Sequence, residues 1–160
     1  MDLEIRADDL THPAVIALLE HHLVDFAQHS PIESMHALDL DGLRAADVTF
    51  WTAWNGDQLV GCGALKHLDP DPDGRRHGEI KSMRVADEFR GRGAGALIVR
   101  HLIDEARRRG YARLSLETGS PEAFAPARRL YARHGFAECG PFADYAPDPW
   151  STFMTLDLTT

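Results

Sequence analysis

Residues 90–95, Arg-Gly-Arg-Gly-Ala-Gly, have the composition of an anion-binding loop. Glycine tolerates positive φ angles, so consecutive backbone N–H groups can converge on one ligand without Cβ atoms in the way. The amphipathic stretch that follows predicts a helix, and the N-terminus of a helix attracts negative charge. Because two arginines lie in the same loop, the expected ligand is a diphosphate. The alternative is a glycine-rich helix entry that holds no ligand.

Two nucleotide-binding motifs fit this loop less well. Gly91-x-Gly93-x-x-Ala96 formally matches the dinucleotide fingerprint, and Glu117 follows at the spacing of a ribose-binding acid. In that motif the first glycine follows its strand almost directly, whereas here residues 86–90 intervene, and too little chain remains for a second mononucleotide-binding half. A P-loop requires Gly-Lys-Ser/Thr at the helix start, but Gly95 is followed by Ala96.

The loop resembles instead the acyl-CoA loop of the GNAT N-acetyltransferase superfamily, Arg/Gln-x-x-Gly-x-Gly/Ala, which Arg90, Gly93 and Gly95 match position for position. Residues 127–136 resemble a second signature of that family, A-x-x-L-Y-x-x-x-G-F. The resemblance covers residues 48–158 well and the N-terminal part loosely. Two motifs correctly spaced around a β-α-β-α frame are more specific than one short glycine motif.

The resemblance implies an α/β fold for a single domain, residues 1–160, with a mixed, mostly antiparallel central sheet flanked by helices and a splayed central strand pair. It also implies acetyl-CoA as co-substrate. Phe124 stands where many relatives carry a cofactor-contacting asparagine, so contacts there are expected to be apolar or to backbone. The residues expected to contact the cofactor are Met83, Val85, Arg90, Gly91, Arg92, Gly93, Ala94, Gly95, Phe124 and Tyr131.

Acetyl transfer to an amine also needs groups that move protons. A lysine-like amine has a pKa of about 10.4, so a base or a desolvating pocket must remove its proton at neutral pH. The resemblance gives this role to Glu79, directly or through water, and the alternative is a strand-end carboxylate in solvent. It gives protonation of the departing thiolate to Tyr131, for which the alternative is a core tyrosine bonded to a backbone carbonyl. Backbone near Val85 is expected to stabilise the oxyanion, beside a bulge that splays the strand from its neighbour.

The acceptor pocket is expected in the parts that resemble the family least, residues 29–38 and 142–150. The candidate contacts are His29, Glu33, His36 and Tyr145. We expect the acceptor to be a small molecule whose primary amine attacks directly in a ternary complex. Two alternatives stay open: a protein N-terminal or lysine acetyltransferase, and a non-catalytic acyl-CoA-binding sensor. A homodimer is also left open.

The elements that must position these residues follow from hydrophobic periodicity and turn signals. Strands are expected at 3–6, 48–54, 58–65, 80–85, 112–118 and 153–158, with a hairpin turn at Asn55-Gly56-Asp57. Helices are expected from Pro13 to the break at residues 29–31, over 94–109, and from Ala125 onward.

Composition excludes several classes of protein. At 160 residues, with 44% hydrophobic residues and a net charge of −8, the chain is typical of one globular domain and is a poor candidate for nucleic-acid binding. No apolar run is long enough to span a bilayer, and acidic residues interrupt any signal peptide, so no membrane partner is expected. The two cysteines do not make a disulfide framework, so a cytoplasmic location is expected.

Two patterns of polar residues invite a metal, and neither is expected to bind one. Residues 69–74 copy the start of a calcium-binding loop, but Ile80 takes the place of its bidentate glutamate, so a turn between strands is expected. His22, Asp25 and His29 share one helix face without a His-Glu-x-x-His pattern, and that face is expected to be solvated or internally satisfied.

Overall fold

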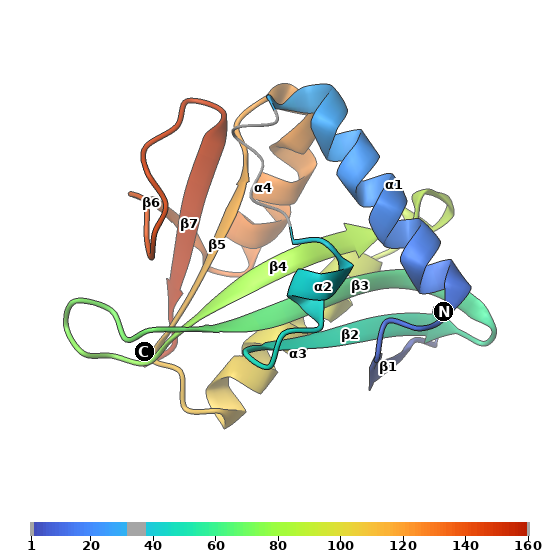
Figure 1. Ribbon diagram of the computed structural model, residues 1–160, viewed down its shortest axis with the longest axis horizontal. Helices are drawn as coiled ribbons and strands as arrows, with labels where there is room; N and C mark the ends of the chain where they lie inside the picture. The colour runs from blue at the N-terminus through green and yellow to red at the C-terminus, as the bar shows by residue number, and fades with distance from the viewer. Residues whose placement is uncertain (1, 32–37, 160) are drawn as a thin grey trace.

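Seven strands form one sheet in the computed structural model, which describes residues 2–31 and 38–159 (Figure 1). They are β1 (Glu4–Ala7), β2 (Val48–Asn55), β3 (Gln58–Leu68), β4 (His77–Val85), β5 (Arg113–Gly119), β6 (Ala137–Cys139) and β7 (Ser151–Asp157). Their order across the sheet is β1-β2-β3-β4-β5-β7-β6, and every neighbouring pair is antiparallel except the central pair, β4 and β5. The expected mixed, mostly antiparallel sheet is therefore confirmed. The short edge strand β6 was not expected from the sequence.

Helices cover both faces of the sheet (Figure 1). α1 (Pro13–His29) and α2 (Leu40–Leu43) pack on one face, and α3 (Ala94–Arg108) and α4 (Ala125–Arg133) pack on the other. α1 begins where His12 accepts the N–H of Ala14 through its ring nitrogen. α3 is followed by Gly110 at φ 77°, a left-handed residue that closes the helix. None of the helices within residues 2–31 and 38–159 is long and apolar enough to cross a bilayer.

Each face has its own apolar core, and helical spacing explains which side chains fill it. Val15 and Leu19, four residues apart on α1, are buried against Phe50 and Trp54 of β2. On the opposite face α3 buries a stripe that includes Ile98 and Leu102, together with residues of β3, β4 and β5. The sheet is therefore covered on both sides around β4, which places that strand at the centre of the molecule.

A β-bulge lies within β4. Cys62 of β3 pairs with Arg84 and Ala64 pairs with Lys81, so the single residue Gly63 faces two residues, Ser82 and Met83. Ser82 has a φ of 52°, which is uncommon for a residue with a side chain and marks the bulge. The expected position of the bulge, at Val85, is therefore wrong by about three residues along the strand. An extra residue in one strand changes which side chains share a face.

The bulge places two cations on the same face of β4. Lys81, before the bulge, contacts Tyr145, and Arg84, after it, forms an ion pair with Asp25 of α1. Met83 and Val85 point to the opposite face, where they pack against the core beneath α3 and α4. Strict alternation would have put Lys81 and Arg84 on opposite faces.

β4 and β5 pair along only part of their length. Residues His77–Ile80 pair with Arg113–Leu116, and beyond Ile80 the strands are no longer neighbours in the ladder. β5 continues to Gly119 against β7, while β4 continues to Val85 against β3. The expected splay of the central strand pair is therefore present, and it leaves a gap in the middle of the sheet.

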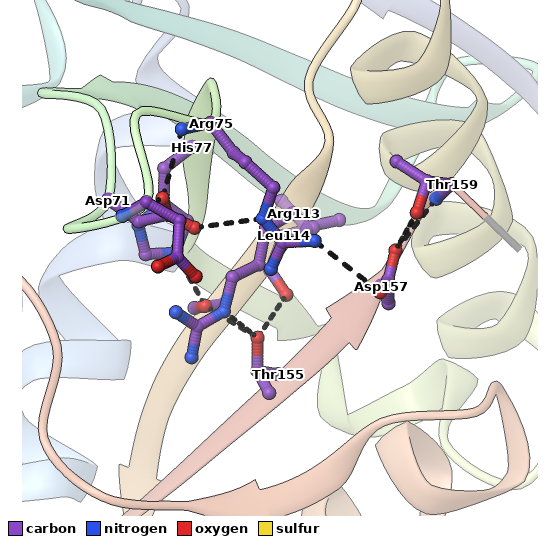
Figure 2. Close-up of polar contacts among 10 residues, drawn as sticks. Asp71, Arg75, His77, Arg113, Leu114, Thr155, Asp157 and Thr159 are labelled. Carbon is purple, nitrogen blue, oxygen red and sulfur yellow. Dashed lines mark hydrogen bonds and ion pairs between the residues drawn. The ribbon is translucent and has the colours of Figure 1, made fainter.

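Polar side chains hold the closed end of this strand pair together. His77 Nε2 of β4 lies 2.6 Å from Ser115 Oγ of β5, and Ser115 Oγ lies 2.9 Å from Thr155 Oγ1 of β7. Arg113 donates from Nε to the same Thr155 hydroxyl at 2.8 Å, as Figure 2 shows. Burial, and then the nearby charge of Arg113, lower the pKa of His77 to about 4, so its imidazole is neutral at pH 7.

The loop between β3 and β4 is a turn, as expected. The buried carboxylate of Asp71 accepts the backbone N–H groups of Asp73 and Arg75, and the Arg75 side chain also reaches Asp71 (Figure 2). These hydrogen bonds hold the pKa of Asp71 below its usual value. Asp71 therefore organises its own loop, and Arg75 also reaches Asp157 at 3.5 Å, which ties the loop to the end of β7.

Candidate active site

A cavity of about 690 Å³ lies where β4 and β5 part. Its walls come from the C-terminal half of α1, the end of β4 with the loop and first turn of helix after it, the end of β5, residues 123–124, and α4. It is lined by most of the residues expected to contact the cofactor, namely Met83, Val85, Arg90, Gly91, Gly93, Ala94, Gly95, Phe124 and Tyr131. The two sequence motifs, far apart along the chain, therefore meet at one cavity.

The glycines of the loop at 90–95 leave open space at the start of α3. Gly91 and Gly93 have φ angles of 76° and 83°, and no atom lies within 4 Å of a Cβ built on either residue. Gly93 is the N-cap of α3. Because glycine has no side chain, it offers no side-chain acceptor there to the first N–H groups of the helix. This arrangement fits an anion of the size of a diphosphate.

Gly95 serves a different purpose from the other two glycines. It lies inside α3, and a Cβ at this position would lie 3.1 Å from Leu130 Cδ2 of α4. A side chain at residue 95 would therefore press on α4. The requirement for glycine here is the close approach of two helices, and not a positive φ angle.

The two arginines of the loop differ in their surroundings. Arg90 lines the cavity, with its guanidinium 3.1 Å from the carboxylate of Asp87 and its side chain 57% exposed. Arg92 lies outside the cavity lining, with its guanidinium 5.6 Å from the centre of the Phe89 ring. Arg90 is thus the arginine of the loop that lies in the cavity wall.

Tyr131 reaches the cavity from α4. Its ring packs edge-on against Phe136 at 5.7 Å, and burial raises the pKa of its hydroxyl. Within the described parts of the chain, no group is hydrogen-bonded to that hydroxyl, so the alternative of a hydroxyl bonded to a backbone carbonyl is not found there. A buried, neutral hydroxyl beside a cavity can donate a proton to a ligand.

Glu79 is buried, and the alternative of a strand-end carboxylate in solvent is wrong. The residue is 2% exposed, and its Oε2 accepts hydrogen bonds from the Tyr145 hydroxyl at 2.5 Å and from Lys81 Nζ at 3.3 Å. Glu79 itself is not part of the cavity lining, whereas Ile80 and Lys81 are. Glu79 is therefore outside the cavity lining, and its carboxylate is hydrogen-bonded to Lys81, a residue of that lining.

Tyr145, expected to contact the acceptor, lies against Glu79 and not in the lining of the cavity. Its ring packs with Phe142 and Phe153 at 5.1 and 5.5 Å. Burial, followed by the negative charge of Glu79, raises the pKa of its hydroxyl, which stays protonated. Lys81, which completes this group, was missed from the sequence. Lys81 could have been found from its spacing, because residues two apart on a strand, here Glu79 and Lys81, point to the same face.

One side of the cavity is bounded by the end of α1. His29 lines the cavity as expected, while Glu33 and His36 lie outside the described residues. Asp25, one turn before His29, accepts from Arg84 at 2.7 Å, and that hydrogen bond lowers the pKa of Asp25. This face of α1 is therefore a wall of the cavity on which Asp25 is paired internally, as expected, while His29 is exposed.

Aromatic side chains of η3 and α1 contact each other at the cavity wall. Phe124, in the 3₁₀ turn η3 (Glu122–Phe124), lies 4.9 Å from Phe26 and 6.0 Å from His29 of α1, measured between ring centres. Gly119 allows this arrangement, because a Cβ there would lie 2.2 Å from the Phe124 ring. Phe124 therefore makes an apolar contact between η3 and α1 at the cavity wall.

Comparison with known proteins places these features in a family. The model of the acetyltransferase (GNAT) family matches residues 15–136. The chain is 52% identical to the uncharacterized N-acetyltransferase YsnE of Bacillus subtilis, over 98% of this chain and 100% of that one, and 40% identical to the IAA acetyltransferase of Azospirillum brasilense, over 98% and 99%. A crystal structure of a Bacillus subtilis acetyltransferase in complex with CoA superposes with a TM-score of 0.67 at 20% identity, covering 98% of this chain and 99% of that one. The chain belongs to the acetyltransferase (GNAT) family and is an N-acetyltransferase.

Proposed function

We propose that this protein transfers an acetyl group from acetyl-CoA to a primary amine of a small molecule, by direct attack in a ternary complex. The observation that carries the proposal is the gap between β4 and β5, which opens beside a helix N-terminus bearing two unobstructed glycines. A CoA thioester has a diphosphate and an extended amide-containing arm. The first suits the loop at 90–95, and the second suits the unpaired edge of β4.

Acetyl-CoA supplies the activated acetyl group as a thioester. On the protein side, residues 81–85 of β4 have no β5 partner in the described ladder, so their backbone groups on that edge are available to hydrogen-bond the amides of the arm and the acetyl oxygen. Tyr131, facing the same space, is positioned to donate a proton to the sulfur that leaves.

Glu79 is proposed to take up the proton that the acceptor amine releases. Its support is its burial next to the cavity wall and its hydrogen bonds from two donors, Tyr145 and Lys81, which fix the carboxylate in one place. The acceptor itself is proposed to enter between α1 and the end of β4, near His29. The residues on this side include both acidic and basic groups, among them Asp25 and Arg84.

The experiment is a thiol-release assay with acetyl-CoA and a panel of acceptors: small primary amines, short peptides with free N-termini or lysines, and no acceptor. The proposal expects thiol release that depends on a small amine, and initial rates whose reciprocal plots intersect, as direct transfer requires. Peptide-dependent release would favour a protein acetyltransferase. Binding of acetyl-CoA without release in any mixture would favour a non-catalytic sensor.

A further inference from the structure

The carboxylate proposed as base is hydrogen-bonded to a residue that lines the cavity. Glu79 does not line the cavity, but Lys81 does, and Lys81 Nζ lies 3.3 Å from Glu79 Oε2. An acceptor amine in the cavity therefore has Lys81, and not Glu79, in the wall around it. From this geometry, and resting on the proposed function, we infer that Lys81 is a catalytic residue that relays the proton of the acceptor amine to Glu79.

The position of the Lys81 ammonium is well defined. Nζ donates to the Tyr145 hydroxyl at 2.8 Å as well as to Glu79, and it lies 5.5 Å from the centre of the Tyr145 ring. Its side chain is 7% exposed and that of Glu79 is 3% exposed. Tyr145 in turn donates to Glu79 at 2.5 Å, so three polar groups form one compact cluster.

Charged groups of the neighbouring elements lie around this cluster. Lys66 faces Glu79 across the β3–β4 ladder, and the pKa of Tyr145 responds to the charge of Glu117 on β5 as well as to that of Glu79. Asp25 of α1 and its ion-pair partner Arg84 of β4 also line the cavity.

The proton balance of the relay is simple. The Lys81 ammonium passes a proton to the Glu79 carboxylate, which leaves a neutral amine and a carboxylic acid. The neutral Lys81 amine then takes a proton from the acceptor ammonium, so the acceptor becomes a neutral nucleophile and Lys81 is again an ammonium. After the products leave, Lys81 loses a proton to water in the open cavity and takes the proton back from Glu79, which restores the ion pair.

The first of these transfers runs between two side chains that are hydrogen-bonded and buried together. In water a carboxylate is a far weaker base than an amine, and the transfer would be strongly unfavourable. A buried ion pair, however, bears a desolvation cost on both charges, and a neutral pair does not. The Lys81 and Glu79 side chains form a buried pair of this kind, with exposures of 7% and 3%.

The test compares Lys81→Arg and Lys81→Met with the matched control Lys66→Met. Lys66 is on the neighbouring strand opposite Glu79 and is outside the cavity lining. Arginine keeps the positive charge beside Glu79 but cannot give up its proton near neutral pH, because its pKa lies above about 12. Methionine removes both the charge and the proton. For each protein, kcat and KM are measured across pH with a small amine, together with acetyl-CoA affinity and the melting temperature.

The relay predicts that Lys81→Arg and Lys81→Met both lose about a hundredfold in kcat at pH 7, with acetyl-CoA affinity kept and Lys66→Met active. Both losses should shrink as pH approaches the pKa of the acceptor, since solution then supplies the neutral amine. Wild-type kcat and an unchanged pH profile in Lys81→Arg would overturn the relay and leave Lys81 a purely electrostatic role. If the wild-type protein releases no thiol with any amine, the proposed function fails first, and the relay fails with it.

Discussion

Replacing Gly93 with aspartate tests the proposed diphosphate site through charge. Gly93 is the N-cap of α3, has a φ of 83°, and has no atom within 4 Å of a built Cβ, so a side chain can leave the backbone there without a clash. It would occupy the space in which the diphosphate is proposed to bind. Two unit charges at about 4 Å repel by about 1 kcal/mol in bulk water and about 4 kcal/mol at the effective dielectric constant of a protein surface.

This repulsion should weaken acetyl-CoA binding by a factor between about 5 and about 1,000. A partly open site lies between these two limits, so we expect at least a tenfold loss of affinity in Gly93→Asp, measured by calorimetric titration at low salt. Gly93→Asn has nearly the same shape without the charge and should lose less. The difference between the two variants should shrink as salt is added, because the repulsion is screened.

Gly56→Asp is the matched control for this experiment. Gly56 also has a positive φ, 59°, and no atom within 4 Å of its built Cβ, but it lies in the β2–β3 turn, outside the cavity. Both aspartates carry a similar backbone cost of about 1–2 kcal/mol and the same added charge. Gly56→Asp should therefore lose stability without losing acetyl-CoA affinity. A folded Gly93→Asp protein that binds acetyl-CoA as tightly as Gly56→Asp would refute the assignment of the loop.

Three further predictions concern the proton-handling residues and the closed end of the sheet. Tyr131→Phe should lower kcat roughly a hundredfold while the melting temperature stays near that of the wild type, because no described residue is hydrogen-bonded to the hydroxyl; a large loss of stability with kcat intact would make Tyr131 structural. Glu79→Gln should lower kcat and remove the acidic limb of the pH–rate profile at similar acetyl-CoA affinity, and an unaltered profile would assign the base to another group. The pKa of His77 falls from 6.5 to about 4 on folding, so the unfolded chain binds more protons in this range, and the free energy of unfolding should decrease as pH falls from 6.5 to 4, on the order of 3 kcal/mol for this one group. His77→Gln should flatten that decrease in denaturant titrations, leaving the parts due to His22, whose pKa burial also lowers to about 4, and to His101, whose pKa burial lowers as well; an equal slope in the variant would contradict the buried neutral imidazole.

Local backbone requirements explain what could be predicted of the fold and the site. The loop at 90–95 and the signature at 127–136 can each be recognised from a few neighbouring residues. Both segments line the cavity. Alternation and turn signals located six of the seven strands, with boundaries shifted by up to about three residues. The edge strand β6 escaped because three residues are too few to show a period.

Features that depend on distant contacts were not predictable in the same way. Tyr145 and Glu79 are hydrogen-bonded although 66 residues separate them, and nothing local to either residue signals the other. The bulge at Ser82 is an extra residue in a strand whose sequence otherwise looks regular. Its position was therefore expected too near the C-terminal end of the strand. That one-residue shift also determines that Arg84 faces α1, which strand alternation would not have predicted.

The proposed site is tested most directly by a crystal structure determined with acetyl-CoA. We expect the diphosphate on the backbone N–H groups of residues 91–96, the extended arm along the unpaired edge of β4 beyond Ile80, and the sulfur within hydrogen-bonding reach of the Tyr131 hydroxyl. A cofactor bound elsewhere on the surface, or a gap between β4 and β5 that stays closed to acetyl-CoA at saturating concentration, would contradict the proposed site.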